Sequence, residues 1–341
     1  MKGASIISIF IALVFIVGGL ILCAQARDKA SNDAAIDGNT LVNEDGNVVT
    51  EVLLTGQTFS MVNIDVTDCK VEVHGNAETS SVTLINFNEN TYVAASGEKV
   101  LTVSNKISIL DYFNLDGAGV RFSGVWKTLR SFLNFDTSAG EREIHIYIGN
   151  DADVSKINVN CDSGSNLRVA DIDKDCDISL TATDSALEIS NINAAAMTIA
   201  GSNSEITLGN SNVTSFEYFA TATNFTASGV IAENVTVDTK SSNVSLLSTE
   251  FRNMSVTLET GDLVLSTKYD RLSYFRKIAI TEGEILLSGN SIGQKDESAE
   301  ELLESAPGTM TVTVNAGKID LTFGSEALPE LKEENPSAPK T

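Results

Sequence analysis

The sequence predicts an all-β protein: a single-stranded parallel β-solenoid with coils of 19–20 residues and an N-terminal signal or anchor helix. Three observations predict this fold. Apolar residues recur at a nearly fixed spacing, strands alternate apolar and polar residues, and Ser, Asn, Asp, Thr or Gly turns separate the strands. A helical solenoid is excluded because stripes with a helical period are nearly absent. A β-sandwich is the structural alternative, since short alternating strands also suit it.

The repeat is clearest when the segments are aligned on one apolar residue. Members of this column follow one another at 20, 19, 19, 19 and 19 positions: Leu167, Leu187, Ile206, Phe225, Val244 and Leu263. Two residues later the chain is apolar or small, at Val169, Ile189, Leu208, Ala227, Leu246 and Leu265. Two residues earlier it is small, at Ser165, Ser185, Ser204, Thr223, Ser242 and Gly261. A single coil has too few apolar residues to form a core of its own. We therefore expect the columns to form ladders inside a stack of coils.

Further segments extend this pattern in both directions along the chain. Each regular unit has a second alternating pair upstream, such as Ile178 and Leu180. Residues 282–287 and 316–321 repeat the turn and strand of residues 260–265. On the N-terminal side, Val62 to Val73 alternates in the same way and predicts an isolated early coil.

The first segment predicts export from the cytoplasm. Lys2 precedes an uncharged, largely apolar run from Gly3 to Ala26. We expect cleavage after Ala26, although the run approaches the length of an uncleaved membrane anchor, and Cys23 leaves a lipoprotein open. In each case the body of the protein lies outside the cytoplasm, as a cell-surface, secreted or membrane-anchored protein.

The predicted organisation has four parts. Residues 1–26 form the signal peptide or membrane anchor, and residues 27–58 form a leader. The β-solenoid spans residues 59–323, with an aromatic insertion at 107–135 and an acidic insertion at 294–304 that is expected to be a solvated loop or a short helix. Residues 324–341 are expected to form a disordered tail, because Pro and charged residues dominate them.

The charge balance narrows the class of partner. Asp and Glu number 46 against 23 Lys and Arg, a net charge of −23. A basic footprint for phosphate backbones is missing, so nucleic-acid binding is not expected. An acidic surface repels anionic lipids and polymers. A surface glycan or a protein is therefore the expected partner, with membrane attachment through the N-terminal segment left open.

An aromatic cluster interrupts the repeat and supplies the candidate interaction patch. The stretch from Ile107 to Phe135 could form a helix or loop that covers an open end of the solenoid. Alternatively, it could contact a ligand or a membrane. The patch consists of Trp126, Phe122, Phe132 and Phe135.

Residues that carry chemistry are scarce. His74 and His145 are the only imidazoles, and the alternation around His145 predicts an outward strand position. Four aspartates alternate along one short stretch of the chain. Paired carboxylates of this kind could serve as acid and base or bind Ca²⁺ weakly, but we expect these aspartates to form a solvated corner of the solenoid. That run is Asp171, Asp173, Asp175 and Asp177. We therefore predict no catalytic residue, cofactor or dedicated metal site.

Two features remain open at the level of sequence. Cleavage would leave three cysteines, of which Cys161 and Cys176 either pair or stay buried as thiols. Five Asn-x-Ser/Thr sequons could accept glycans but also suit turns and outer faces. These sequons lie at Asn212, Asn224, Asn234, Asn243 and Asn253.

Three segments resemble the putative-adhesin family of exported bacterial and archaeal proteins. They are Thr260-Gly261-Asp262-Leu263-Val264-Leu265, the copy at residues 241–246, and the strand at residues 143–148. The resemblance covers roughly residues 59–323, and the chain departs from the Ser-Gly-Asp-Val pattern by placing Asn or Ala where the family often has Asp. It implies a β-solenoid at the cell surface and carries over no catalytic residue.

The predicted function is that of an exported, non-enzymatic cell-surface β-solenoid, acting as an adhesin or as an envelope scaffold and binding module. Two alternatives stay open. A polysaccharide-processing β-helix enzyme would need convergent carboxylates with Arg or Lys on one face. An envelope-stress sensory component rests on the family resemblance alone.

Overall fold

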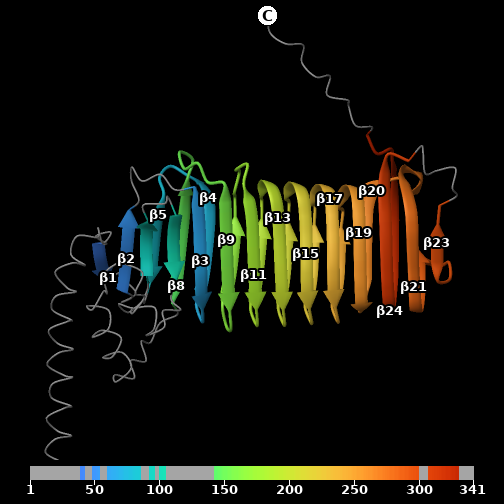
Figure 1. Ribbon diagram of the computed structural model, residues 1–341, viewed down its shortest axis with the longest axis horizontal. Coiled ribbons are helices and arrows are strands. Elements are labelled where there is room, and N and C mark those ends of the chain that lie inside the picture. The colour runs from blue at the N-terminus through green and yellow to red at the C-terminus, as the bar shows by residue number, and fades with distance from the viewer. Residues whose placement is uncertain are drawn as a thin grey trace, which may run out of the picture.

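The structure, a computed structural model, describes residues 39–42, 48–53, 60–85, 92–96, 100–104, 142–298 and 306–329. These residues form a long stack of parallel strands (Figure 1). The predicted all-β solenoid is therefore confirmed, and the parallel pairing excludes the β-sandwich. The signal or anchor segment, residues 1–26, and the aromatic patch at Trp126, Phe122, Phe132 and Phe135 lie outside the described residues. No helix in the described part of the chain is long and apolar enough to cross a membrane.

Each coil contributes one strand to each of two parallel sheets. The first sheet contains β3 (Met61–Thr67), β7 (Val100–Ser104), β9 (Lys156–Asp162), β11 (Asp177–Thr183), β13 (Asn193–Ser202), β15 (Asn212–Thr221), β17 (Ile231–Lys240) and β19 (Glu250–Thr260). The second contains β4 (Lys70–Ala77), β8 (Glu143–Gly149), β10 (Asn166–Ala170), β12 (Ala186–Ser190), β14 (Glu205–Gly209), β16 (Asn224–Ser228), β18 (Asn243–Leu247) and β20 (Leu263–Tyr269). The long strands β21 (Tyr274–Leu287) and β24 (Gly308–Glu326) each cross both sheets.

The apolar columns of the repeat become inward ladders of directly paired residues. Leu167 pairs with Leu187, and the same register continues in every coil to Leu263. All six members of this column are at most 2% exposed. Because parallel strands stack in register, each apolar side chain packs on its counterparts in the coils above and below.

The small column beside these ladders forms a corner with buried hydroxyls. Ser185, Ser204, Thr223 and Ser242 each donate a hydrogen bond to the carbonyl two residues earlier, at 2.7–3.0 Å. Ser204 and Ser242 also accept a backbone N–H from the preceding coil, at 3.3 and 3.1 Å. Ser and Thr side chains are short enough to reach the buried backbone groups of their own corner, which explains why this column holds small residues.

The sequons have a structural role in the solenoid. Asn243 Nδ2 donates to Asn224 Oδ1 at 3.3 Å, and Asn253 Nδ2 donates to Asn234 Oδ1 at 3.0 Å. Asn212 makes a longer contact of the same kind with Asn193, at 3.5 Å. Equivalent amides in successive coils therefore stack as ladders, which explains why Asn recurs there.

The two ends of the solenoid are stacked out of chain order. β24 lies between the coil of β19 and β20 on one side and β21 on the other (Figure 1). At the N-terminal end, the coil of β3 and β4 lies between β9 and β10 on one side and β7 and β8 on the other. β24 is the last strand of the described residues, and it is thus held on both edges by strands that precede it in the chain.

Antiparallel strands cover both ends. β5 (Ser81–Ile85) pairs with β8 and with β2 (Val48–Leu53), and β2 pairs with β1 (Asn39–Val42). β6 (Tyr92–Ser96) pairs with β7. At the other end, β22 (Asn290–Ser291) and β23 (Lys295–Glu297) pair with β21. The predicted leader thus contains strands, and closure of this kind blocks uncontrolled edge-to-edge pairing.

The acidic insertion differs from the expected solvated loop or short helix in its first residues. Residues 295–297 form β23, and Asp296 is 6% exposed. Asp296 lies opposite inward-facing Ile278, so its side chain enters the end of the core, where Arg276 Nε donates to its Oδ2 at 3.0 Å. Arg276 occupies the inward position that Met310 holds in the neighbouring strand, so both charged side chains are buried and form an ion pair with each other.

The C-terminal limit of the fold lies slightly beyond the predicted start of the tail at residue 324. β24 ends at Glu326, and Leu328 is buried. Arg252 holds both ends of β24 by donating hydrogen bonds to the carbonyl of Pro307, just before the strand, at 2.7 Å and to the carbonyl of Pro329, just after it, at 2.6 Å.

Candidate functional site

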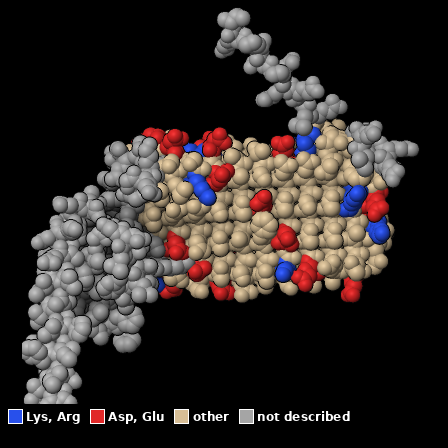
Figure 2. Space-filling view, viewed as in Figure 1, with Lys and Arg blue, Asp and Glu red and all other residues tan. Residues whose placement is uncertain are grey.

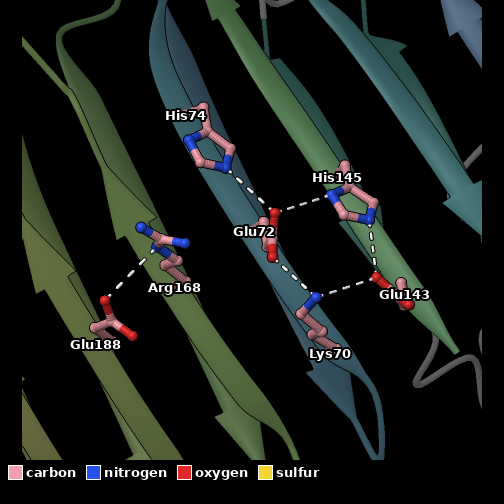
Figure 3. A network of polar contacts seen from close by, with 7 residues as sticks. All are labelled: Lys70, Glu72, His74, Glu143, His145, Arg168 and Glu188. Atoms are coloured by element: carbon pink, nitrogen blue, oxygen red, sulfur yellow. Dashed lines mark hydrogen bonds and ion pairs between the residues drawn. The ribbon is translucent and has the colours of Figure 1, made fainter. Parts of the chain in front are cut away.

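The candidate site begins where β4 meets β8, on the outer face of the second sheet. Alternation turns Val71 and Val73 of β4 and Ile144 and Ile146 of β8 into the core. The residues that alternate with them therefore face outward, and the parallel register brings them together (Figure 3). We call Lys70, Glu72, His74, Glu143 and His145 the seam cluster.

Two carboxylates organise the seam cluster. Glu72 Oε2 lies 3.3 Å from His74 Nε2 and 3.1 Å from His145 Nδ1. The other ring nitrogen of His145 lies 3.0 Å from Glu143 Oε2. Lys70 Nζ contacts both carboxylates, at 3.0 Å from Glu72 and 3.3 Å from Glu143. Each side chain that carries nitrogen in this cluster thus points at acidic oxygens.

The charges of the seam cluster set the protonation of Glu72. Burial alone would raise the pKa of this carboxyl, but hydrogen bonds from Lys70 and His74 and the charge of His145 outweigh burial and lower it to about 2. Lys70 in turn donates hydrogen bonds to Glu72 and Glu143, and these bonds raise the pKa of Lys70 above its usual value, although burial opposes them. Glu72 therefore stays ionised at any ordinary pH and cannot serve as a general acid.

This pKa predicts how acid affects stability. Because the carboxyl of Glu72 has a lower pKa in the folded protein (about 2) than its ordinary value of 4.5, its ion pairs stabilise the fold above pH 4.5 and are lost as the pH falls toward 2. We expect the free energy of unfolding to fall more steeply with acid in the wild type than in Glu72→Gln. Denaturant titrations across this interval measure both slopes, and parallel curves would contradict the prediction.

The charged side chains continue across the next two strands as a ladder. His145, Glu72, Arg168 and Glu188 occupy one register on β8, β4, β10 and β12, and their charges alternate in sign when His145 is protonated (Figure 3). Arg168 Nε lies 3.7 Å from Glu188 Oε1, and both side chains are at least half exposed. This outer pair adds little stability and leaves most donors of Arg168 available to a ligand.

A shallow groove of about 430 Å³ lies beside the charged ladder. It crosses β4, β10, β12 and β14 because the short side chains of Asn166 and Ala186 stand between the longer Lys70 and Glu205. Its walls therefore carry both charge signs, while its floor is lined by small side chains.

The outer face of the first sheet has a different character. Figure 2 shows few charged side chains over these strands, whereas acidic residues gather along the upper edge. Hydroxyls line up in register from coil to coil, although Glu217 and Asp238 interrupt the pattern. We call the best-ordered part the hydroxyl face; it consists of Thr236, Ser255, Thr257, Thr311 and Thr313 on β17, β19 and β24.

The structure places the predicted chemical residues as follows. His74 and His145 lie together, and His145 faces outward as expected. The four aspartates of the alternating run are exposed at a corner, where Asp171 and Asp173 accept amide hydrogen bonds from Asn191 and Asn193 at 2.9 and 2.7 Å. Within the described residues, no three His, Cys, Asp or Glu side chains are arranged to hold a metal ion.

The cysteine pairing that the sequence left open does not form. Cys176 is a buried free thiol. Burial, reinforced by the neighbouring Asp177 and Asp175, raises the pKa of this thiol to about 11. Such a thiol is poorly reactive at neutral pH.

The sequence did not identify the carboxylates and cations of the seam cluster as a site. Alternation within Lys70-Val71-Glu72-Val73-His74 does show which residues face outward. What alternation cannot show is that a strand 73 residues away supplies the neighbours. The pairing of β4 with β8 depends on coils stacked out of chain order.

Comparison with protein-family models agrees with this architecture. A family model described as Toastrack DUF4097 matches residues 76–322. The crystal structure of a "putative lipid binding protein" from Parabacteroides distasonis ATCC 8503 is similar at a TM-score of 0.46 and 9% identity, over 83% of this chain and 95% of that chain. That of a "putative cell adhesion protein" from Clostridium sporogenes ATCC 15579 is similar at a TM-score of 0.25 and 11% identity, over 85% and 100%. No curated protein matches the chain.

Proposed function

Because the chain belongs to the Toastrack DUF4097 family, we propose that it is an exported, non-enzymatic β-solenoid that acts at the cell surface as an adhesin-like binding module. The expectation of export comes from the apolar N-terminal segment. The resemblance of its Ser-Gly-Asp-Val type coils to the putative-adhesin family supports the same proposal.

The observation that carries the proposal is the hydroxyl face. Thr236, Ser255 and Thr311 are direct neighbours across three strands, as are Thr257 and Thr313 across two. Parallel strands hold such side chains about 4.8 Å apart on a rigid surface. A surface of this kind offers many hydrogen bonds without a net charge requirement, which suits a neutral glycan.

The chemistry of the charged ladder supports a binding role over a hydrolytic one. A glycosidase needs one carboxyl that carries a proton near neutral pH and a second that attacks or activates water. Glu72 has a pKa of about 2, and Lys70 contacts both Glu72 and Glu143. A carboxyl with so low a pKa cannot be the protonated acid of such a pair.

Lysine substitutions separate the hydroxyl face from the rest of the surface. We expect Thr257→Lys with Thr311→Lys to weaken binding to a glycan-array ligand at least about tenfold, because two ammonium groups would displace several hydrogen bonds. Thr226→Lys adds the same kind of charge at an exposed position on the second sheet and serves as the matched control. Equal binding by the wild type, the double variant and the control would contradict the proposed use of this face.

A further inference from the structure

The groove beside the charged ladder, with a volume of about 430 Å³, has its cations on one half and an excess of anions on the other. Lys70 and Arg168 line the half over β4 and β10, whereas Glu188 and Glu205 line the half over β12 and β14. The parallel register fixes this order, because β10 pairs with β4 on one edge and with β12 on the other, and β12 pairs in turn with β14.

Arg168 is the cation of the groove that keeps free donors. Lys70 Nζ is already engaged by Glu72 and Glu143, at 3.0 and 3.3 Å. Arg168 is half exposed, and its ion pair with Glu188 runs through Nε at 3.7 Å (Figure 3). A guanidinium has five N–H donors in a planar fork, so the two terminal nitrogens of Arg168 can still hold a carboxylate in a bidentate manner.

Glu205 is the anion at the opposite end. Its side chain is exposed, and no described residue forms a hydrogen bond or ion pair with its carboxylate. The next strand, β16, places uncharged Asn224 beside it. Glu188, one strand back, also keeps one carboxylate oxygen away from Arg168. The negative charge at this end is therefore available to a cationic group of a ligand.

The spacing of these charges selects a class of ligand. Arg168 and Glu205 lie on strands that are two apart, so they are separated by about 10 Å across the sheet. Asn166 and Thr207 line the groove with uncharged polar groups. The glutamates repel an anionic polymer and Arg168 repels a polycation, whereas a ligand with one charge of each sign about 10 Å apart meets a partner at both ends. An extended tripeptide has about this length.

We propose that the groove binds a zwitterionic ligand of about tripeptide length, with its carboxylate on Arg168 and its ammonium group on Glu205 and Glu188. Asn166 and Thr207 hydrogen-bond to the polar groups between the two charged ends. This site lies on the second sheet and takes a different ligand from the hydroxyl face on the first sheet, so either site can exist without the other.

Titration of the intact protein with triglycine at low ionic strength, followed by backbone amide chemical shifts, tests the groove. We expect signals of β10, β12 and β14 to move and those of β17 and β19 to stay in place. N-Acetyltriglycine lacks the ammonium group and triglycine amide lacks the carboxylate, so each should bind about fivefold more weakly, the effect of one exposed charge contact. Equal binding of the three peptides, or no movement in β10, β12 and β14, would overturn the proposal.

Two substitutions at exposed positions assign the ends of the ligand. Arg168→Gln should remove the preference for triglycine over triglycine amide, and Glu205→Gln should remove most of the preference for triglycine over N-acetyltriglycine. Glu217→Gln changes the same kind of charge on the outer face of the first sheet and is the matched control, which should keep both preferences. An Arg168→Gln variant that still preferred the free carboxylate would overturn the assigned site.

Discussion

Replacing Gly317 with alanine is expected to lower the free energy of unfolding by about 3–5 kcal/mol. Gly317 is the middle member of a column of three glycines that stack at one corner, between Gly261 and Gly283. A Cβ on Gly317 would stand 1.9 Å from the backbone oxygen of Gly261, and the φ of Gly317 is +148°. Both the backbone conformation and the close approach of the next coil therefore require glycine.

Chemical denaturation followed by circular dichroism measures this effect. Gly209→Ala is the matched control, because its new Cβ would meet nothing closer than Ile189 O at 3.9 Å and its φ is ordinary. We expect that control to stay within about 1 kcal/mol of the wild type. If Gly317→Ala were as stable as Gly209→Ala, the stacking of β24 between its two neighbours would be wrong.

Replacing Asp296 with asparagine is expected to cost about 3–5 kcal/mol, because it leaves a buried cation without its anion. Arg276 is 4% exposed and donates to Asp296 Oδ2 at 3.0 Å, while Arg271 contacts the other carboxylate oxygen. The remaining bonds of Arg276 go to the carbonyls of Arg271 and Tyr274 and cannot neutralise its charge. Loss of stability should be accompanied by faster hydrogen exchange in β23.

A double-mutant cycle separates the lost charge partner from lost packing. Arg276 occupies the register of Met310 and Met254, so Arg276→Met extends an existing column of methionines. In that background, Asp296→Asn should cost less than half of its effect in the wild type. Equal cost in both backgrounds would show that Asp296 acts through its shape and not through its charge.

The repeat predicted which side chains form the interior of the fold, because the alternation that turns a side chain inward lies within each coil. Leu167 and Leu187 must face inward wherever their coils lie, and the regular spacing of the repeat then sets their register. The early coil at Val62 to Val73 follows from the same alternation, but it is not isolated, because its strand β3 pairs with both β7 and β9. The corner hydroxyls, typified by Ser204, were visible as a small column, although their bonds to backbone groups were not.

The order of coils at the two ends could not be predicted from the repeat. The repeat predicts how one coil stacks on another coil, but it does not predict which two coils are neighbours in the stack. Ile285 precedes Ile319 in the chain, yet Ile319 is the residue that pairs with Leu263. The seam cluster has the same origin, because Glu72 and His145 meet only through such an exchange. The sequence around Asp296 predicted a solvated acidic insertion; Asp296 is buried instead because β23 pairs with β21, the terminal long strand of the stack.

The most direct test of the central claim is a combined binding and hydrolysis screen of the intact protein against polysaccharides. The proposed binding module predicts retention on neutral glycans, weakened by the paired lysines at Thr257 and Thr311, with no release of soluble products. Release of products by the wild type at a rate that Glu72→Gln abolishes would contradict it and would favour a polysaccharide-processing enzyme.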